Sequence, residues 1–200
     1  MLNYGNLYLL LYNTHFTQGD CSRGPGSDSE SFIRLLRSLS EAFRPRGLLL
    51  TTAVSANKIV IDRAYNRQYI PSLIELVDWI GVMTYDYHTA WEQETGHIAP
   101  LYHHPRDSAL ILNANFSVRY WIERGVPADM IVMGIPTYGS SFTLSEKLQN
   151  HASGFHVKAS GPGKPGKFTR SAGFLAYYEV SVDRCDYEIA REYCCLRNSL

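Results

Sequence analysis

The chain has 200 residues, of which 45% are hydrophobic and 19% are charged, a composition typical of a soluble globular domain. Lysine plus arginine equals aspartate plus glutamate at 19 each, so we expect neither nucleic acid nor an anionic membrane surface as a partner. The longest apolar run, Leu7–Tyr12, is far shorter than the roughly 20 residues of a membrane span. It also lacks the flanks of a signal peptide, so we expect no convincing leader or membrane anchor here.

The predicted elements alternate between helix and strand. Ser27–Phe43 has apolar residues at helical spacing with cap candidates before it, and Leu48–Ser55 is a short apolar run typical of a buried strand. Ile61–Val77 predicts a second helical region that is broken near Pro71, and Trp79–Tyr85 predicts a second buried strand.

The pattern continues through the second half of the chain. Ser108–Arg124 predicts a third helix, and Met130–Gly139 predicts a third strand. This rhythm is that of parallel βα units with right-handed crossovers, so we expect an α/β fold. Ser160–Val180 is rich in Gly and Pro and then aromatic, which predicts a loop that leads into a strand of a smaller lobe. Cys185–Asn198 has mixed helical propensity and no clear apolar face.

Polar and aromatic side chains follow two of the predicted strands. Tyr85, Asp86 and Tyr87 come after one strand, and Thr137 and Tyr138 come after another. Because βα loops gather at the carboxyl ends of parallel strands, we expect these groups to share a cleft. A Tyr-Asp pair after a strand, taken alone, is more often a turn in front of a capped helix.

Four ordered motifs resemble the glycoside hydrolase family 18 chitinases, and in particular the arthropod type. They are MTYDYHTAW at Met83–Trp91, TGHIAPLY at Thr95–Tyr102, the segment Gly125–Leu144 and the segment Gly161–Glu179. The resemblance runs almost unbroken from about Thr17 to Glu179. It implies a partial (β/α)8 TIM barrel, with strands five to seven and the start of an inserted α+β lobe.

The resemblance also implies the domain bounds and the location. Residues 1–16 form an unmatched N-terminal segment, 17–144 a partial barrel, and 145–200 the start of the inserted lobe with an unmatched tail. An extracellular location follows by resemblance, as does a partner: chitin or an N-acetylglucosamine oligosaccharide. No cofactor and no metal are implied.

The implied chemistry explains the aromatic motif after the second strand. In this family the substrate's own acetamido oxygen attacks the reacting centre, so the protein must hold that acetamide. By resemblance, Tyr85 donates a hydrogen bond to it, and Asp86 supports the sugar and the reacting centre. Met83 lines the floor under the ring, Trp91 stacks on a neighbouring sugar, and Tyr138 adds a polar contact.

Other chemical signals in the sequence are weaker. Gly161–Lys167 matches a phosphate-binding loop up to its lysine, but Phe168 replaces the required Ser or Thr, so we do not expect nucleotide binding. His103 and His104 have no carboxylate or cysteine at ligand spacing, which favours a solvated loop over a metal site. The cysteines fit neither a CxxC metal pattern nor a dense disulfide framework: Cys21, Cys185, Cys194 and Cys195.

The general acid of the family is missing from these 200 residues. That acid is the glutamate ending a D-x-x-D-x-D-x-E motif on the fourth strand, and the nearest string, Asp183–Glu188, lacks one aspartate and follows the seventh strand. Ser140 also replaces a usual arginine. We therefore expect no hydrolysis by this chain alone.

Three hypotheses remain open. The chain is an incomplete copy of a secreted chitin hydrolase, a catalytically dead chitin-binding lectin, or a fragment that works only with another chain. A sheet lacking several barrel strands has open edges, so we also expect self-association.

Overall fold

The computed structural model describes residues 8–12, 28–65, 67–146 and 154–182, and its contacts divide the chain into two units. The first unit comprises Met1–Thr84 and Ala114–Gly134, and the second comprises Tyr85–Asn113 and Ile135–Leu200. The domain bounds predicted from the sequence stay a prediction; by contacts, residues 85–113 belong to the second unit. The four cysteines and Asp183–Glu188 lie outside the described residues.

The first unit is built on a four-stranded parallel sheet with the order β1-β2-β3-β4. The strands are β1 (Tyr8–Tyr12), β2 (Leu49–Ser55), β3 (Trp79–Met83) and β4 (Ile131–Met133). The last three match the predicted strands, because their apolar runs are short and bounded by turn signals. Strand β1 was not predicted as a strand: a five-residue apolar run does not reveal its partner, which is β2 in register Tyr8 to Leu49.

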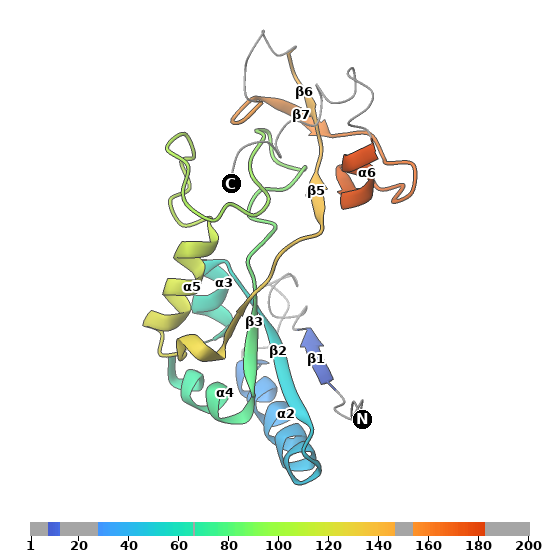
Figure 1. Cartoon of the computed structure of the whole chain (residues 1–200). Helices are drawn as coiled ribbons and strands as arrows, with labels where there is room; N and C mark the ends of the chain where they lie inside the picture. Colours follow the sequence, from blue (N-terminus) through green and yellow to red (C-terminus); the bar gives the residue numbers. More distant parts are fainter. Residues whose placement is uncertain (1–7, 13–27, 66, 147–153, 183–200) are drawn as a thin grey trace. The chain divides into compact units, whose positions relative to one another are not determined.

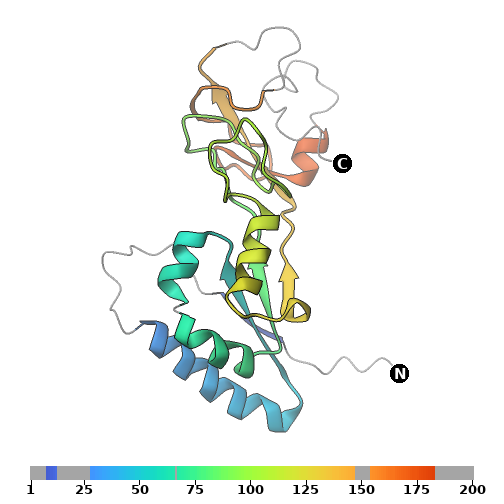
Figure 2. The same cartoon turned by 90° about the vertical axis from the view of Figure 1, so that its left-hand side faces the viewer.

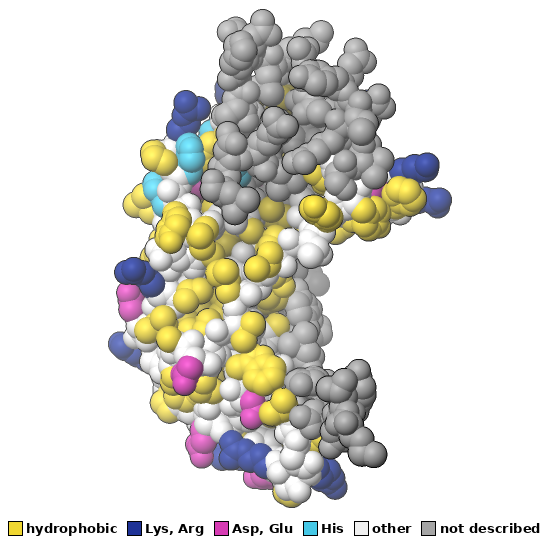
Figure 3. Space-filling model, in the orientation of Figure 1, with side chains coloured by type: hydrophobic (Ala, Val, Ile, Leu, Met, Phe, Trp, Pro, Cys, Tyr) yellow, Lys and Arg dark blue, Asp and Glu magenta, His cyan; other side chains and the backbone are white. Residues whose placement is uncertain are grey.

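Helices cover one face of this sheet (Figures 1 and 2). Helix α2 (Asp28–Phe43) confirms the first predicted helix, and it buries Phe32 and Leu36 toward the core. On the edge strand β4, Val132 and Met133 are 50% and 43% exposed. Figure 3 shows hydrophobic side chains at the surface over this part of the unit.

The second predicted helical region consists of two short helices, α3 (Lys58–Ala64) and α4 (Ile70–Leu76), with a 3-10 turn, η2 (Arg67–Tyr69), before α4. The predicted break near Pro71 is present: α3 ends at Ala64, and α4 begins at Ile70, one residue before the proline. Pro71 lies in the first turn of α4, where its missing N–H costs nothing and its fixed φ favours a helix start.

Helix α5 (Ala114–Glu123) is shorter than predicted. Its start is delayed because Asp107 accepts a hydrogen bond from the Ala109 N–H at 2.8 Å, an Asx turn that competes with a helix. Within α5, Ser117 donates to the Ala56 carbonyl at 2.7 Å and is fully buried. The Asn115-Phe116-Ser117 glycosylation sequon therefore lies in a packed helix, where we expect little modification.

The second unit contains two small antiparallel sheets. Strand β5 (Tyr138–Ser140) pairs with β8 (Phe174–Ala176), and β6 (Phe142–Leu144) pairs with β7 (Ala159–Pro162). Helix α6 (Tyr177–Val182) follows β8 directly. These elements confirm the predicted loop and strand after the glycine-rich segment.

Segment 85–113 has no helix or strand and only an isolated bridge, between Glu94 and Lys158, and backbone hydrogen bonds join it to residues 156–159, among them the Thr95 N–H to the Val157 carbonyl at 2.9 Å. None of the helices that the structure describes has the length and hydropathy of a membrane-spanning segment.

Candidate functional site

Tyr85, Asp86 and Tyr138 lie together in the second unit. The Tyr138 hydroxyl donates a hydrogen bond to Asp86 Oδ1 at 2.8 Å, and the rings of Tyr85 and Tyr138 are 6.2 Å apart in an edge-on arrangement. Asp86 follows β3, whereas Tyr138 begins β5, so 52 residues separate the two partners of the hydrogen bond. The predicted proximity of these side chains is therefore present in the structure.

The backbone at Asp86 has an unusual conformation. Its φ is 59°, in the left-handed region, which aspartate tolerates better than most residues because its short side chain can form local hydrogen bonds. The Asp86 carboxylate is exposed to solvent, while Tyr85 and Tyr138 are half-buried. An exposed carboxylate anchored by a tyrosine hydroxyl is a polar group that a ligand can reach.

Strand pairing positions the Tyr138 ring. Tyr138 is opposite Ala176 in the β5–β8 register, and its ring lies 4.9 Å from that of Phe174 on the partner strand. Phe174 is 37% exposed, so this pair presents aromatic surface as well as a hydroxyl. Adjacent aromatic and polar groups of this kind suit the apolar faces and hydroxyl groups of a sugar.

The other two predicted site residues have different settings. Trp91 belongs to the same unit and is 77% exposed, which is rare for a side chain of this size. Met83 ends β3 in the first unit, where it is half-buried and opposite Ser55 in the β2–β3 register.

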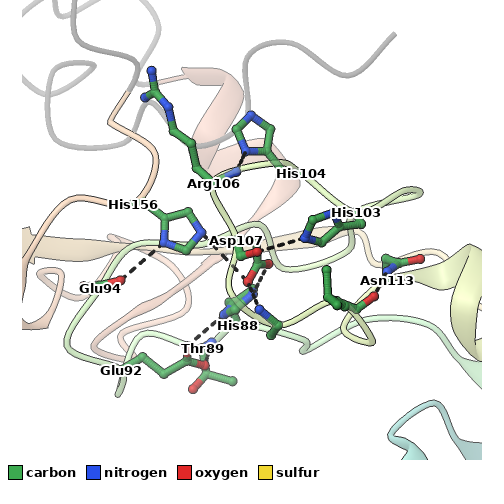
Figure 4. Close-up of polar contacts among 12 residues, drawn as sticks. His88, Thr89, Glu92, Glu94, His103, His104, Arg106, Asp107, Asn113 and His156 are labelled. Carbon is green, nitrogen blue, oxygen red and sulfur yellow. Dashed lines mark hydrogen bonds and ion pairs between the residues drawn. The ribbon is translucent and has the colours of Figure 1, made fainter.

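A cluster of polar side chains that sequence reasoning missed surrounds the buried His88 (Figure 4). His88 Nδ1 is 2.8 Å from Glu92 Oε2, and His88 Nε2 is 2.9 Å from Asp107 Oδ2. Gly96 packs against the His88 ring so closely that a Cβ there would lie 2.4 Å from Cγ of His88. Only the four-residue spacing of His88 and Glu92 was visible in the sequence; the contact with Asp107, 19 residues further on, was not.

The charge of His88 follows from these contacts. Burial alone would lower the pKa of His88, but the two carboxylates raise it by more, so it lies above its ordinary value of 6.5. Burial would raise the pKa of Asp107, but the Ala109 N–H and His88 lower it. Both shifts favour the charged pair, an imidazolium beside a carboxylate.

The expected solvated loop at His103 and His104 is wrong. Both side chains are half-buried: His103 Nε2 is 2.8 Å from the Asp107 carbonyl, and the His104 ring packs edge-on against Phe155 with centroids 4.2 Å apart. Phe155 lies far from His104 in the sequence, so the spacing of residues could not reveal this contact. Within the described part of the chain, no group of three or more His, Cys, Asp or Glu side chains could hold a metal ion.

Comparisons with known proteins agree on the family. The family model described as glycosyl hydrolases family 18 matches residues 15–192, which extends beyond the predicted limits of the resemblance. Probable chitinase 10 of Drosophila melanogaster is 48% identical over 177 residues, which are 88% of this chain and 8% of that protein.

Solved structures give the fold. Catalytic domain 2 of the Ostrinia furnacalis Group II chitinase is 41% identical with a TM-score of 0.78, over 92% of this chain and 46% of that one. Human YKL-39, a pseudo-chitinase that retains chitooligosaccharide binding, is 37% identical with a TM-score of 0.70, over 80% of this chain and 45% of that one.

The chain thus spans a small part of the Drosophila protein and just under half of each solved chain. Its fold is part of a (β/α)8 barrel, as the four parallel strands and their covering helices show. By the family match and by these relatives, the chain belongs to glycosyl hydrolases family 18.

Proposed function

We propose that the second unit carries a binding site for N-acetylglucosamine oligosaccharides of the chitin type. The observation that carries this proposal is the hydrogen bond from Tyr138 to Asp86 beside the Tyr85 ring. Tyr85 would donate to the acetamide of the sugar, and Asp86 would support the sugar and its reacting centre. Trp91 would stack on a neighbouring sugar.

The chain by itself binds without hydrolysing, according to this proposal. The 200 residues lack the glutamate motif that protonates the leaving oxygen, and general acid catalysis typically contributes about 10²–10⁴-fold. Human YKL-39, a pseudo-chitinase with retained binding, supports the idea that this fold can bind sugar without turnover. In a longer protein that supplies the acid, the same residues would serve a chitin hydrolase. By the same resemblance we propose an extracellular location.

Two substitutions test the sugar site directly. We expect Asp86→Ala and Trp91→Ala each to weaken binding of the N-acetylglucosamine pentamer by roughly tenfold or more, because a charged hydrogen-bond partner or a stacking ring is lost. Titration calorimetry measures the affinity, and a release assay on the same samples checks for turnover.

Matched controls come from the same unit. Tyr102→Ala removes another exposed aromatic ring, 66% exposed, and should leave the affinity unchanged. Equal losses for Trp91→Ala and Tyr102→Ala would show that the pentamer binds nonspecifically to aromatic surface. Pentamer cleavage by the unmodified chain would contradict the proposed absence of turnover.

We also propose that the chain self-associates through the open edge of its parallel sheet. Strand β4 pairs only with β3 among the described strands, and it exposes Val132 and Met133. An apolar, unpaired edge favours addition of further strands. We expect Val132→Lys to shift the species seen by light scattering toward the monomer of 22.7 kDa. A monomer in both proteins at all concentrations would show that this edge does not associate.

A further inference from the structure

The loop that carries Trp91 is closed by Glu92, whose N–H donates to the Thr89 carbonyl at 3.1 Å and whose carboxylate makes two further contacts. Glu92 Oε1 accepts a hydrogen bond from the Thr89 N–H at 2.8 Å, and Glu92 Oε2 contacts His88 Nδ1 at 2.8 Å. Trp91 directly precedes Glu92, and its side chain is 77% exposed. The indole therefore lies on a short loop that the Glu92 carboxylate links to the buried His88 ring.

The ring of His88 needs two protons in this arrangement. A neutral imidazole has one N–H and one lone pair, so one of its nitrogens would direct a lone pair at a carboxylate oxygen. The distances of 2.8 Å and 2.9 Å to Glu92 and Asp107 fit two donated hydrogen bonds. The observed geometry is that of an imidazolium between two carboxylates.

We infer that His88 is a positioning residue for Trp91. Its imidazolium links the Trp91 loop to Asp107, and loss of one proton breaks the contact between His88 and Glu92. The inference about the loop stands on the contacts of the second unit. Its consequence for sugar affinity rests on the proposed function, in which Trp91 stacks on a sugar.

The contact that breaks on deprotonation can be identified from burial. The Glu92 side chain is 42% exposed, whereas that of Asp107 is 6% exposed. An unpaired carboxylate costs far more in the interior than in contact with water, so the remaining proton stays on the nitrogen that faces Asp107. Glu92 Oε2 is then solvated, and the loop loses its link to His88 while it keeps the two hydrogen bonds between Glu92 and Thr89.

Other ionisable groups around His88 act on the same charge. The His156 ring is 6.4 Å from the His88 ring, its Nε2 is 3.9 Å from Asp107 Oδ1, and its Nδ1 is 3.3 Å from Glu94 Oε2. His103 contacts the Asp107 backbone carbonyl rather than its carboxylate. Within the described part of the chain, these groups and Glu92 are the titratable side chains of the cluster around His88 (Figure 4). His156, when charged, competes for Asp107.

The pH dependence has a definite sign. Because the pKa of His88 in the folded chain lies above 6.5, the tie is complete below that pH and is lost as the pH rises through the raised value. The lowered pKa of Asp107 keeps its carboxylate ionised throughout this window. The Trp91 loop is thus linked to His88 at low pH and loses this link as the pH rises.

The test measures how freely acrylamide quenches Trp91 fluorescence between about pH 6 and pH 9. Subtracting the signal of Trp91→Phe removes the contributions of Trp79 and Trp121. We expect quenching to rise with pH in the unmodified chain and to stay constant in Glu92→Gln. With glutamine, the amide oxygen keeps the Thr89 N–H contact and the N–H₂ donates to Nδ1 of a neutral ring whose Nε2–H faces Asp107, so the link no longer requires a second proton on His88.

Glu94→Gln is the matched control, since Glu94 contacts His156 and not His88. It should follow the unmodified chain. The inference is overturned if quenching in the unmodified chain does not change with pH, or if Glu92→Gln responds as the unmodified chain does. Circular dichroism on each variant confirms that it is folded.

A second readout separates this inference from the proposed function. Pentamer affinity should fall by up to roughly tenfold across the same pH range, because the stacking contact of Trp91 is weakened, and should be constant in Glu92→Gln. If quenching follows the expected pattern but the pentamer does not bind at any pH, the sugar site is wrong and the role of His88 stands. If the pentamer binds equally at all pH values while quenching changes, Trp91 does not contact the sugar.

Discussion

Replacing Trp121 by alanine is expected to lower the free energy of unfolding by roughly 3–5 kcal/mol, the range for large-to-small changes at buried aromatic residues. Trp121 lies on α5 and is 0% exposed. Its ring contacts Tyr65 edge-on with centroids 5.1 Å apart, and its Nε1 donates to the Ser55 carbonyl at the end of β2 at 2.9 Å. The substitution removes both the packing that joins helix to sheet and a buried hydrogen bond.

Trp121→Phe separates the two contributions. Phenylalanine keeps most of the buried ring but leaves the Ser55 carbonyl without its indole donor, which should cost about 1–3 kcal/mol. Urea unfolding followed by circular dichroism measures both variants. Equal losses for Ala and Phe would show that the hydrogen bond, and not the packing, dominates at this position.

The second large effect is expected at Glu179 on α6. The side chain is 4% exposed, and its carboxylate accepts hydrogen bonds from three backbone N–H groups that link the preceding loop to α6: Phe168 at 2.7 Å, Thr169 at 3.0 Å and Ala176 at 3.0 Å. Burial would raise its pKa, but these donors lower it from 4.5 to about 2. Gly166 is required beside it, since a Cβ there would lie 2.3 Å from Glu179 Oε1.

Glu179→Gln should lower Tm at neutral pH by roughly 5–10 °C, because an amide N–H₂ replaces an oxygen that faces backbone donors. The stabilisation by the native carboxylate is complete above pH 4.5 and is lost as the pH falls toward about 2, where the carboxylate is protonated. The difference in Tm between the two proteins should therefore shrink across this window.

Thermal unfolding at a series of pH values provides the measurement. Glu123→Gln, at an exposed position of α5, is the control and should change little at any pH. A Tm difference between Glu179→Gln and the unmodified chain that is constant with pH would mean that the ionised carboxylate is not the stabilising group.

The strands that were predicted well share a physical property: their signal is local. Leu49–Ser55 is buried at six of its seven positions, and a continuous apolar, β-branched run of that length predicts a covered parallel strand. The break near Pro71 was predictable for the same reason, because a proline in the first turn is a local signal for a helix start. The late start of α5 was not predicted, because the hydrogen bond from the Ala109 N–H to Asp107 is not part of helix propensity.

The candidate site was predictable where a motif fixed its residues, whereas the cluster around His88 was not. Tyr85, Asp86 and Tyr138 follow strand ends that a parallel fold brings to one edge, so their proximity could be inferred before the structure. His88 contacts Glu92 within its own loop but reaches Asp107 and approaches His156 only through the folded path of residues without regular structure. Contacts of this kind have no periodicity, so no sequence pattern reports them.

Each unit consists of two separate segments, and the segments of the two units alternate along the chain. The first unit needs residues 114–134 to complete its sheet and helix layer, and these follow a segment, 85–113, that belongs to the second unit. During synthesis, the first unit therefore cannot finish folding until the ribosome has also released the 85–113 loop. A protease that cuts this loop would separate the two segments of the first unit and divide the second unit as well. Neither unit could therefore be obtained intact as a contiguous fragment.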